Sequence, residues 1–140
     1  MYLFDSSAII NLVKRGIVEP LAEAVTLELA LYECVNAVWK EHRLLKRIDR
    51  ETALMFLSIL SDVFKVVKRV SIAGSEEDVF KLAAGEGITV YDASYVYAAM
   101  KDGLTLVTDD HALADKASKY VDVTSSSGLA TARSSGDSRV

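Results

Sequence analysis

The sequence predicts an α/β protein with three layers, α/β/α, around a central parallel sheet. Short aliphatic and β-branched runs alternate along the chain with longer segments of helical periodicity. Strands that alternate with helices pair in parallel, because each helix carries the chain back across a face of the sheet. The length of 140 residues and the 51% hydrophobic content suit one domain with a sizeable core.

The first half of the chain predicts one strand followed by helices. The expected elements are a strand at 2–4, a helix ending at Gly16, a brief helix at 20–24, and longer helices at 27–45 and 52–63. Asp5, Ser6 and Ser7 supply side-chain oxygens that can cap the first helix. Pro20 suits the first position of the brief helix. The two longer helices together predict a helical hairpin.

The second half predicts three strands with helices between them. The expected strands lie at 65–70, 104–107 and 120–123, and the helices follow Gly74, Tyr91 and the run 108–110. These helices end near 85–87, 102–103 and Lys119, while 88–90 is too short to classify. After Thr124 the composition turns to serine and glycine. We therefore expect the domain to span 1–124, with 125–140 as a flexible serine-rich C-terminal tail.

Composition and charge narrow the classes of function. With 16 basic and 20 acidic residues the formal net charge is −4, which argues against a uniformly basic nucleic-acid module or a polybasic membrane anchor. One cysteine and two histidines cannot build a zinc site of the Cys/His kind. The acidic start and the absence of a long uncharged apolar run argue against a signal peptide or a membrane span. We expect a cytoplasmic protein with no membrane partner.

Acidic residues interrupt or border apolar elements at four places: Asp5, Glu33, Asp92 and the pair 109–110. Two of these places follow predicted strands, where open parallel sheets hold their ligands. Each aspartate could instead cap a helix, and Glu33 could be a partly exposed helix position. Taken together they predict carboxylates that share a hard divalent cation, Mg²⁺ or Mn²⁺. Such a site suits phosphodiester hydrolysis, because the metal activates water and neutralises the phosphate.

Four short motifs resemble those of the PIN-domain nucleases, and most resemble those of VapC toxins from type II toxin–antitoxin pairs. The motifs are Asp5-Ser6-Ser7 after the opening strand, Glu33 within 31–37, Asp92 within 91–94, and Thr108-Asp109-Asp110 after a strand. Their order and spacing cover residues 1 to about 124. The resemblance implies a PIN-like fold, Mg²⁺- or Mn²⁺-dependent ribonuclease activity on an RNA substrate, a homodimer, and a cognate antitoxin.

The resemblance also assigns roles to individual residues. The catalytic acids are Asp5, Glu33, Asp92 and Asp110, of which the metal ligands are Asp5, Asp92 and Asp110. Supporting hydroxyls are assigned to Ser6 and Thr108. The family usually has threonine, a variable residue and then aspartate, which selects Asp110. Asp109 fills the variable place and could share or take over the role.

A local excess of basic residues offers a way to hold RNA in spite of the acidic total. Residues 40–69 contain eight basic and four acidic side chains. The possible RNA contacts on the helical hairpin are Lys40, Arg43, Lys46 and Arg47. The alternative is an ordinary solvated helix face. His42 is expected on the same surface, and His111 is expected to be exposed beside the acids.

Aromatic and apolar side chains leave further alternatives open. Base stacking or a place in the core could explain Tyr91, Tyr95 and Tyr97. A dimer or antitoxin groove could use the apolar side chains Ile17, Val18 and Leu21. The leading function is a metal-dependent endoribonuclease acting as a toxin. A stand-alone PIN ribonuclease in RNA processing and an inactive PIN module that binds RNA or protein are the alternatives, and retention of all four acids disfavours the inactive one.

Overall fold

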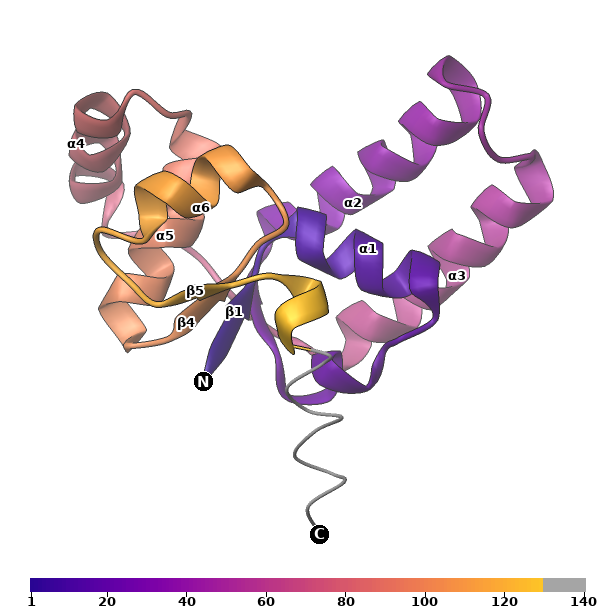
Figure 1. Cartoon of the computed structure of the whole chain (residues 1–140), viewed down its shortest axis with the longest axis horizontal. Coiled ribbons are helices and arrows are strands. Elements are labelled where there is room, and N and C mark those ends of the chain that lie inside the picture. Colours follow the sequence, from indigo (N-terminus) through magenta and orange to yellow (C-terminus); the bar gives the residue numbers. More distant parts are fainter. Residues whose placement is uncertain (130–140) are drawn as a thin grey trace, which may run out of the picture.

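Five short strands build the centre of the structure: β1 (Tyr2–Phe4), β2 (Val25–Leu27), β3 (Lys68–Val70), β4 (Thr105–Val107) and β5 (Val123–Thr124). The structure is a computed structural model that describes residues 1–129 (Figure 1). All pairs are parallel, in the order β3-β2-β1-β4-β5. Central β1 places Leu3 opposite Val25 and Leu106. Leu3 and Leu106 are fully buried, as expected for a parallel sheet covered on both faces.

Helices cover the sheet on both sides and confirm the three-layer prediction. They are α1 (Ser6–Arg15), the 3₁₀ helix η1 (Glu19–Glu23), α2 (Leu29–Trp39), the π-helical η2 (Lys40–Leu44), α3 (Arg50–Val66), α4 (Glu76–Glu86), α5 (Val90–Asp102) and α6 (His111–Ala117). In Figure 1, α1, α2 and α3 gather on one side of the strands and α4, α5 and α6 on the other. None of the helices within residues 1–129 is both long and apolar enough to cross a membrane.

Strand β2 differs from the prediction, which begins a long helix at residue 27. Residues 25–27 instead pair with β1 on one side and with Lys68 to Val70 on the other. Thr26 is fully buried, and its hydroxyl donates a hydrogen bond of 2.6 Å to the carbonyl of Phe4. A strand of three residues is too short for a periodic pattern, so pairing with distant segments decides its structure.

The helical hairpin is confirmed with shifted bounds, because α2 and η2 lead through a short turn into α3. The hairpin projects away from the sheet (Figure 1). Helix α3 begins earlier than predicted, since the Asp49 carboxylate accepts a 2.7 Å hydrogen bond from the backbone N of Thr52 and caps it. Lys14 of α1 forms a 2.5 Å ion pair with Glu41, which ties the hairpin to the first helix.

Two other boundaries move for identifiable reasons. Helix α5 begins at Val90, because the Thr89 hydroxyl accepts a 3.0 Å hydrogen bond from the backbone N of Asp92 and caps the helix. Asp92 therefore lies in the first turn, and the interpretation of Asp92 as a helix cap is wrong. The last strand occupies 123–124 instead of 120–123, since it pairs only with Leu106 and Val107.

The C-terminal tail is predicted to begin at residue 125, which is too early. Residues 126–129 form a helical turn, in which Ser126 is 1% exposed and Leu129 is 4% exposed and belongs to the hydrophobic core. The serine-rich composition concealed this packing, because a single leucine is the only apolar anchor in the turn. The rest of the predicted tail, 130–140, lies outside the described residues.

Candidate active site

The carboxyl ends of β1 and β4 bring Asp5 and Thr108 together. Phe4 and Val107 are paired at the ends of these strands, and the backbone N of Asp5 donates to the carbonyl of Val107 at 3.0 Å. The next residue on each strand therefore leaves the sheet at the same edge, where open α/β sheets bind their ligands.

Asp5 is buried and held by donors on both oxygens. Its Oδ1 accepts hydrogen bonds from the Ser7 hydroxyl at 2.7 Å and from the backbone N of Ala8 at 3.0 Å, which caps α1. Its Oδ2 accepts from the Thr108 hydroxyl at 2.5 Å. The serine of the first motif whose hydroxyl donates to Asp5 is thus Ser7, and not Ser6. Asp5 serves as a helix cap and, at 4% exposure, is also a buried carboxylate at the edge of the sheet.

Burial raises the pKa of Asp5 from its usual 3.8 to about 6, against the lowering effect of its hydrogen bonds. The folded protein therefore binds a proton at Asp5 more tightly than the unfolded chain does. For this group, stability falls as the pH rises through the range between these two values, and the full cost is present above pH 6.

We expect Asp5→Asn to stabilise the metal-free protein by up to about 3 kcal/mol at pH 7.5, and by little at pH 4. The asparagine removes the buried charge and keeps an oxygen for the cap. Urea unfolding of both proteins in EDTA, at several pH values between 4 and 7.5, measures the difference. A difference that does not grow with pH would mean that burial of the charge is not what destabilises the wild type.

Glu33 projects from α2 and is fixed by a residue that the sequence pattern did not assign to the site. The Tyr95 hydroxyl donates a 2.6 Å hydrogen bond to Oε1 of half-buried Glu33. Tyr95 is 1% exposed, and burial followed by the bond to Glu33 raises the pKa of its phenol, so it stays a proton donor. Tyr95 is a buried orienting residue and not a base-stacking surface. Its spacing of three residues from Asp92, on one helical face, was the available signal.

The charge of Asp110, at the N-cap of α6, acts on Asp92, which lies in the first turn of α5. Burial raises the pKa of half-buried Asp92, and the charges of Asp110 and Glu33 raise it further. Asp110 is exposed and caps α6, because its Oδ1 accepts from the backbone N of Leu113 at 3.1 Å. Asp110 therefore combines the capping role with a position close enough to affect Asp92.

The carboxylate of Asp109 is bound by α1 and the C-terminal turn, although its charge still helps to raise the pKa of Asp5. Its Oδ2 accepts from Asn11 Nδ2 at 2.8 Å and from the Ser126 hydroxyl at 2.5 Å, while Oδ1 accepts from the backbone N of Ser126 at 2.7 Å. Both oxygens are thus engaged by donors from α1 and from the C-terminal turn. The adjacent acids of the last motif have separate surroundings.

The candidate acids offer oxygen atoms as ligands, and no cationic side chain in the described part of the chain pairs with them. None of Asp5, Glu33, Asp92, Asp109 and Asp110 forms an ion pair with Lys, Arg or His in the part of the chain that the structure describes. Within residues 1–129, no three His, Cys, Asp or Glu side chains lie close enough to hold a metal ion as they stand. The donor chemistry and the uncompensated charge fit Mg²⁺ or Mn²⁺, which would have to draw the carboxylates together.

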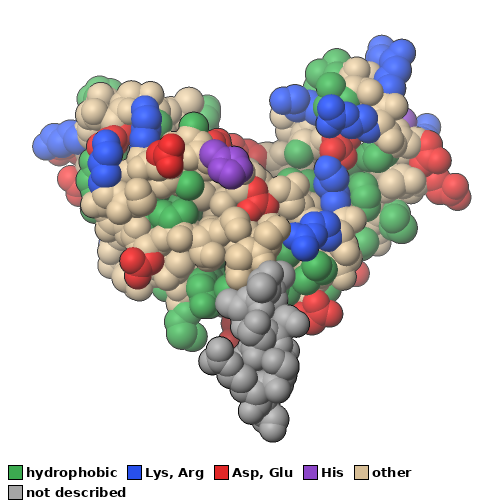
Figure 2. Space-filling view, in the orientation of Figure 1, with side chains coloured by type: hydrophobic (Ala, Val, Ile, Leu, Met, Phe, Trp, Pro, Cys, Tyr) green, Lys and Arg blue, Asp and Glu red, His purple; other side chains and the backbone are tan. Residues whose placement is uncertain are grey.

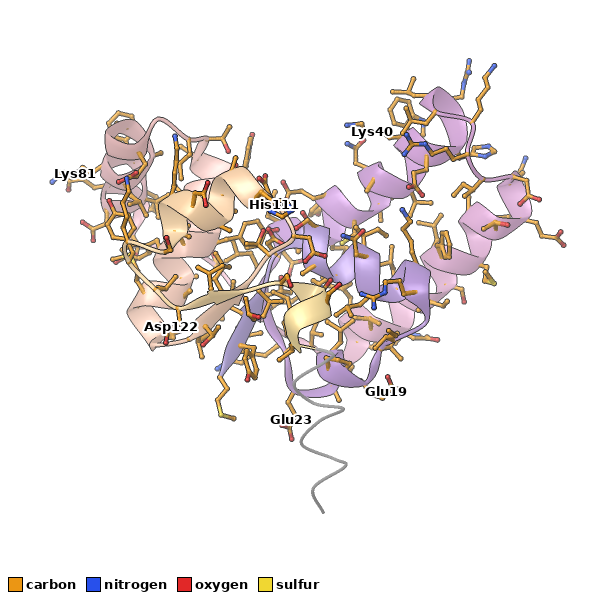
Figure 3. All side chains as sticks on the ribbon, in the orientation of Figure 1. Glu19, Glu23, Lys40, Lys81, His111 and Asp122 are labelled. Carbon is orange, nitrogen blue, oxygen red and sulfur yellow. The ribbon has the colours of Figure 1, made fainter. Side chains whose placement is uncertain are left out.

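The surface beside Asp110 is hollowed. A pocket of about 680 Å³ is lined in part by Asn11, Thr108, Asp110 and His111. Figure 2 shows a notch between the lobe that carries α6 and the lobe that carries α2. His111, which is exposed as predicted, and Lys40 lie on opposite flanks of this notch in Figure 3. Of the candidate acids, Asp109 and Asp110 line this pocket, whereas Asp5, Glu33 and Asp92 do not.

Two relatives in sequence and one solved structure resemble this chain over most of its length. It is 36% identical over 124 residues to Exonuclease VapC9 of Pyrobaculum aerophilum, covering 87% of this chain and 90% of the relative. It is 43% identical over 94 residues to Ribonuclease VapC3 of the same organism, covering 67% and 71%. The crystal structure of PAE2754 from P. aerophilum matches with a TM-score of 0.75 and 31% identity, covering 91% and 90%. No known family model matches the sequence.

The strand order and the acidic edge of the sheet define the class of protein as the PIN-type α/β domains. Within that class, the chain belongs to the VapC family. The family and fold that the four sequence motifs predicted are confirmed.

Proposed function

We propose that this protein is a Mg²⁺- or Mn²⁺-dependent endoribonuclease and the toxin of a type II toxin–antitoxin pair. The carrying observation is the set of carboxylates at the carboxyl edge of the sheet, with no cationic partner among the described residues. The names of the relatives, an exonuclease and a ribonuclease, support nuclease chemistry. A catalytically inactive PIN module would not need to keep these acids.

The proposed metal ligands are Asp5, Asp92 and Asp110. When bound, the cation would supply positive charge that offsets the phosphate and acidifies the attacking water. Thr108 and Ser7 hold Asp5 in one orientation, so little rearrangement is needed at that ligand. Tyr95 occupies Oε1 of Glu33, and Oε2, which has no hydrogen-bond donor among residues 1–129, would accept the proton of the attacking water. Ser6 has only an indirect part in the proposal. Its side chain forms a hydrogen bond with Tyr95 that lowers the pKa of the Tyr95 phenol.

The proposed RNA-binding surface is the basic ridge, which we define as the exposed residues Lys40, Arg43, Lys46 and Arg47. None of them forms an ion pair within residues 1–129, whereas Lys65 and Arg69 pair with acids. Lys40, the first residue of η2, follows Glu33 of α2 by seven residues, about two helical turns or roughly 10 Å. In Figure 2 basic side chains gather on this lobe of the notch. His42 instead supports the turn, with Nδ1 at 3.1 Å from the Ile48 carbonyl.

An antitoxin and a second copy of the chain are the proposed protein partners. Exposed apolar side chains recur along α2 at Tyr32, Val35 and Trp39, which are 69%, 42% and 50% exposed. Their spacing of three and four residues puts them on one helical face, as partner surfaces require. Of the three residues expected to form an apolar groove, Leu21 belongs to the core at 1% exposure, Ile17 is half-buried and Val18 is 37% exposed, so only Val18 offers a large exposed surface there.

Cleavage of a linear and a circular RNA of the same sequence tests the proposed activity. We expect both RNAs to be cut in Mn²⁺ or Mg²⁺ and neither in excess EDTA, with activity restored by added metal. The circle distinguishes the endonuclease from end-directed hydrolysis, because it offers no terminus. Cutting of the linear RNA alone would assign an exonuclease, and undiminished cutting in EDTA would exclude the metal.

A further inference from the structure

Asp109 joins three segments that are far apart in the sequence. The Asn11 amide comes from α1, 98 residues away, and the Ser126 backbone N and hydroxyl come from the C-terminal turn, 17 residues away. All three donors approach within 2.8 Å. Charged acceptors make the stronger hydrogen bonds in proteins, so these contacts hold the three segments together at one side chain.

The backbone around Asp109 is fixed in the same network. The backbone N of Asp109 donates to the Ser7 hydroxyl at 3.0 Å, and the backbone N of Asp110 donates to the Thr108 hydroxyl at 3.1 Å. Those two hydroxyls are the same groups that donate to the carboxylate of Asp5. The position of the 108–110 loop and the orientation of Asp5 are therefore parts of one hydrogen-bonded unit.

The C-terminal turn, which supplies Ser126 to Asp109, is itself held in place by packing. Leu129 is buried in the core, and its backbone N donates to the carbonyl of Ser125 at 3.0 Å. A Cβ at Gly128 would lie 2.8 Å from the Thr124 hydroxyl oxygen, so the turn is closely packed against the end of β5. Ser126 thus belongs to the folded domain, next to the loop that carries Asp110.

We infer that Asp109 is a positioning residue, which fixes the Asp110 loop through Asn11 and Ser126 and makes the C-terminal turn part of the nuclease site. This rests on the proposed function, since Asp110 is a proposed metal ligand. Donors on both oxygens do not by themselves exclude a ligand, since Asp5 has them too. The donors of Asp109 differ in that they come from Asn11 and Ser126, outside the four acidic motifs, whereas Asp110 has one oxygen in the α6 cap. The ligand of the last motif is accordingly Asp110, with Asp109 acting through the loop.

Three variants test the inference through Mn²⁺ affinity, measured from the electron paramagnetic resonance signal of free Mn²⁺. Asn11→Ala and Ser126→Ala should each raise the Mn²⁺ Kd about 3- to 10-fold, and Asp109→Asn by about 10-fold or more, the range seen for residues that orient metal ligands. The KM for RNA should stay within about twofold, because the basic ridge is untouched. Ser126→Ala added to Asp109→Asn should weaken binding no further.

Ser127→Ala is the matched control. Its hydroxyl is exposed and accepts only from Arg15 Nη1, at 3.2 Å, within residues 1–129. Its Mn²⁺ Kd should equal that of the wild type. Asn11 and Ser126 lie in two different segments. If circular dichroism shows that Ser126→Ala does not fold, Asn11→Ala still decides between the outcomes.

Two results would overturn the inference. Loss of Mn²⁺ affinity in Asp109→Asn alone, with Asn11→Ala and Ser126→Ala like the wild type, would mean that Asp109 acts through its own charge, as a ligand or through its effect on Asp5, and not through the loop. Wild-type affinity in all three would leave it no role in the site. Asp5→Asn, tested in parallel, separates these from failure of the proposed function, because Mn²⁺ binding and RNA cleavage that survive Asp5→Asn would dismiss the metal site as a whole.

Discussion

Asp92→Asn is expected to lower Mn²⁺-dependent RNA cleavage by about 1000-fold or more. The charges of Asp110 and Glu33 both raise the pKa of the Asp92 carboxylate, so Asp92 lies where a shared cation would be held. An amide of the same shape keeps the volume and removes the negative charge. A loss of about 4 kcal/mol of stabilisation at the transition state corresponds to this factor.

The fold should survive the same change. Helix α5 is capped by the Thr89 hydroxyl and not by the Asp92 carboxylate, so asparagine at this position leaves the cap intact. Removing a half-buried charge whose pKa is raised by burial should leave the metal-free melting temperature unchanged or higher. A loss of activity without a loss of stability is therefore the expected combination.

Initial rates of RNA cleavage at saturating Mn²⁺, with melting temperatures in EDTA, provide the measurement. Asp122→Asn is the matched control, because this exposed aspartate lies away from the notch (Figure 3). It should cleave at the wild-type rate. Cleavage by Asp92→Asn within tenfold of the wild type would refute the assignment of Asp92 to the site.

Local sequence signals predicted the parts of the fold that short-range contacts determine. The cap at Asp5 and the left-handed Gly16 end of α1 depend on neighbours within four residues. Strand β2 escaped prediction because it is fixed by pairing with β1 and with β3, some 43 residues further on. The start of α3 was misplaced for a different reason, because its Asp49 cap is a local signal, three residues from Thr52, that the prediction did not use.

In the candidate site, too, some residues could be predicted from the sequence and others only from contacts between distant segments. The acids that border strands and helices could be found from their order, because parallel strands bring their carboxyl ends to one edge. The groups that orient them could not. Tyr95 reaches Glu33 across 62 residues, and Ser126 lies in a stretch whose composition resembles a tail. Choosing between Asp109 and Asp110 also needs the fold, since adjacent residues in a loop point to different neighbours.

Reversing two charges of the basic ridge, Arg43→Glu with Arg47→Glu, is expected to weaken binding of single-stranded RNA by about 10- to 100-fold at 50 mM salt. Each lost phosphate contact removes roughly 0.7 from the slope of log affinity against log salt, so the slope should flatten by about 1.4. Both residues are exposed and without an ion pair in the described part of the chain, so their charges are free to meet phosphates.

Net charge is the variable that the control must hold constant. Lys81→Glu with Lys101→Glu changes the total charge by the same amount on exposed positions of α4 and α5, and Figure 3 shows Lys81 far from the notch. Fluorescence anisotropy in EDTA, at several salt concentrations, compares the two double variants without cleavage. Because phosphate contacts act locally and exposed charges are screened beyond about 10 Å, the control should bind nearly as the wild type does. Equal losses in both variants would mean that the acidic total, and not the ridge, governs RNA binding.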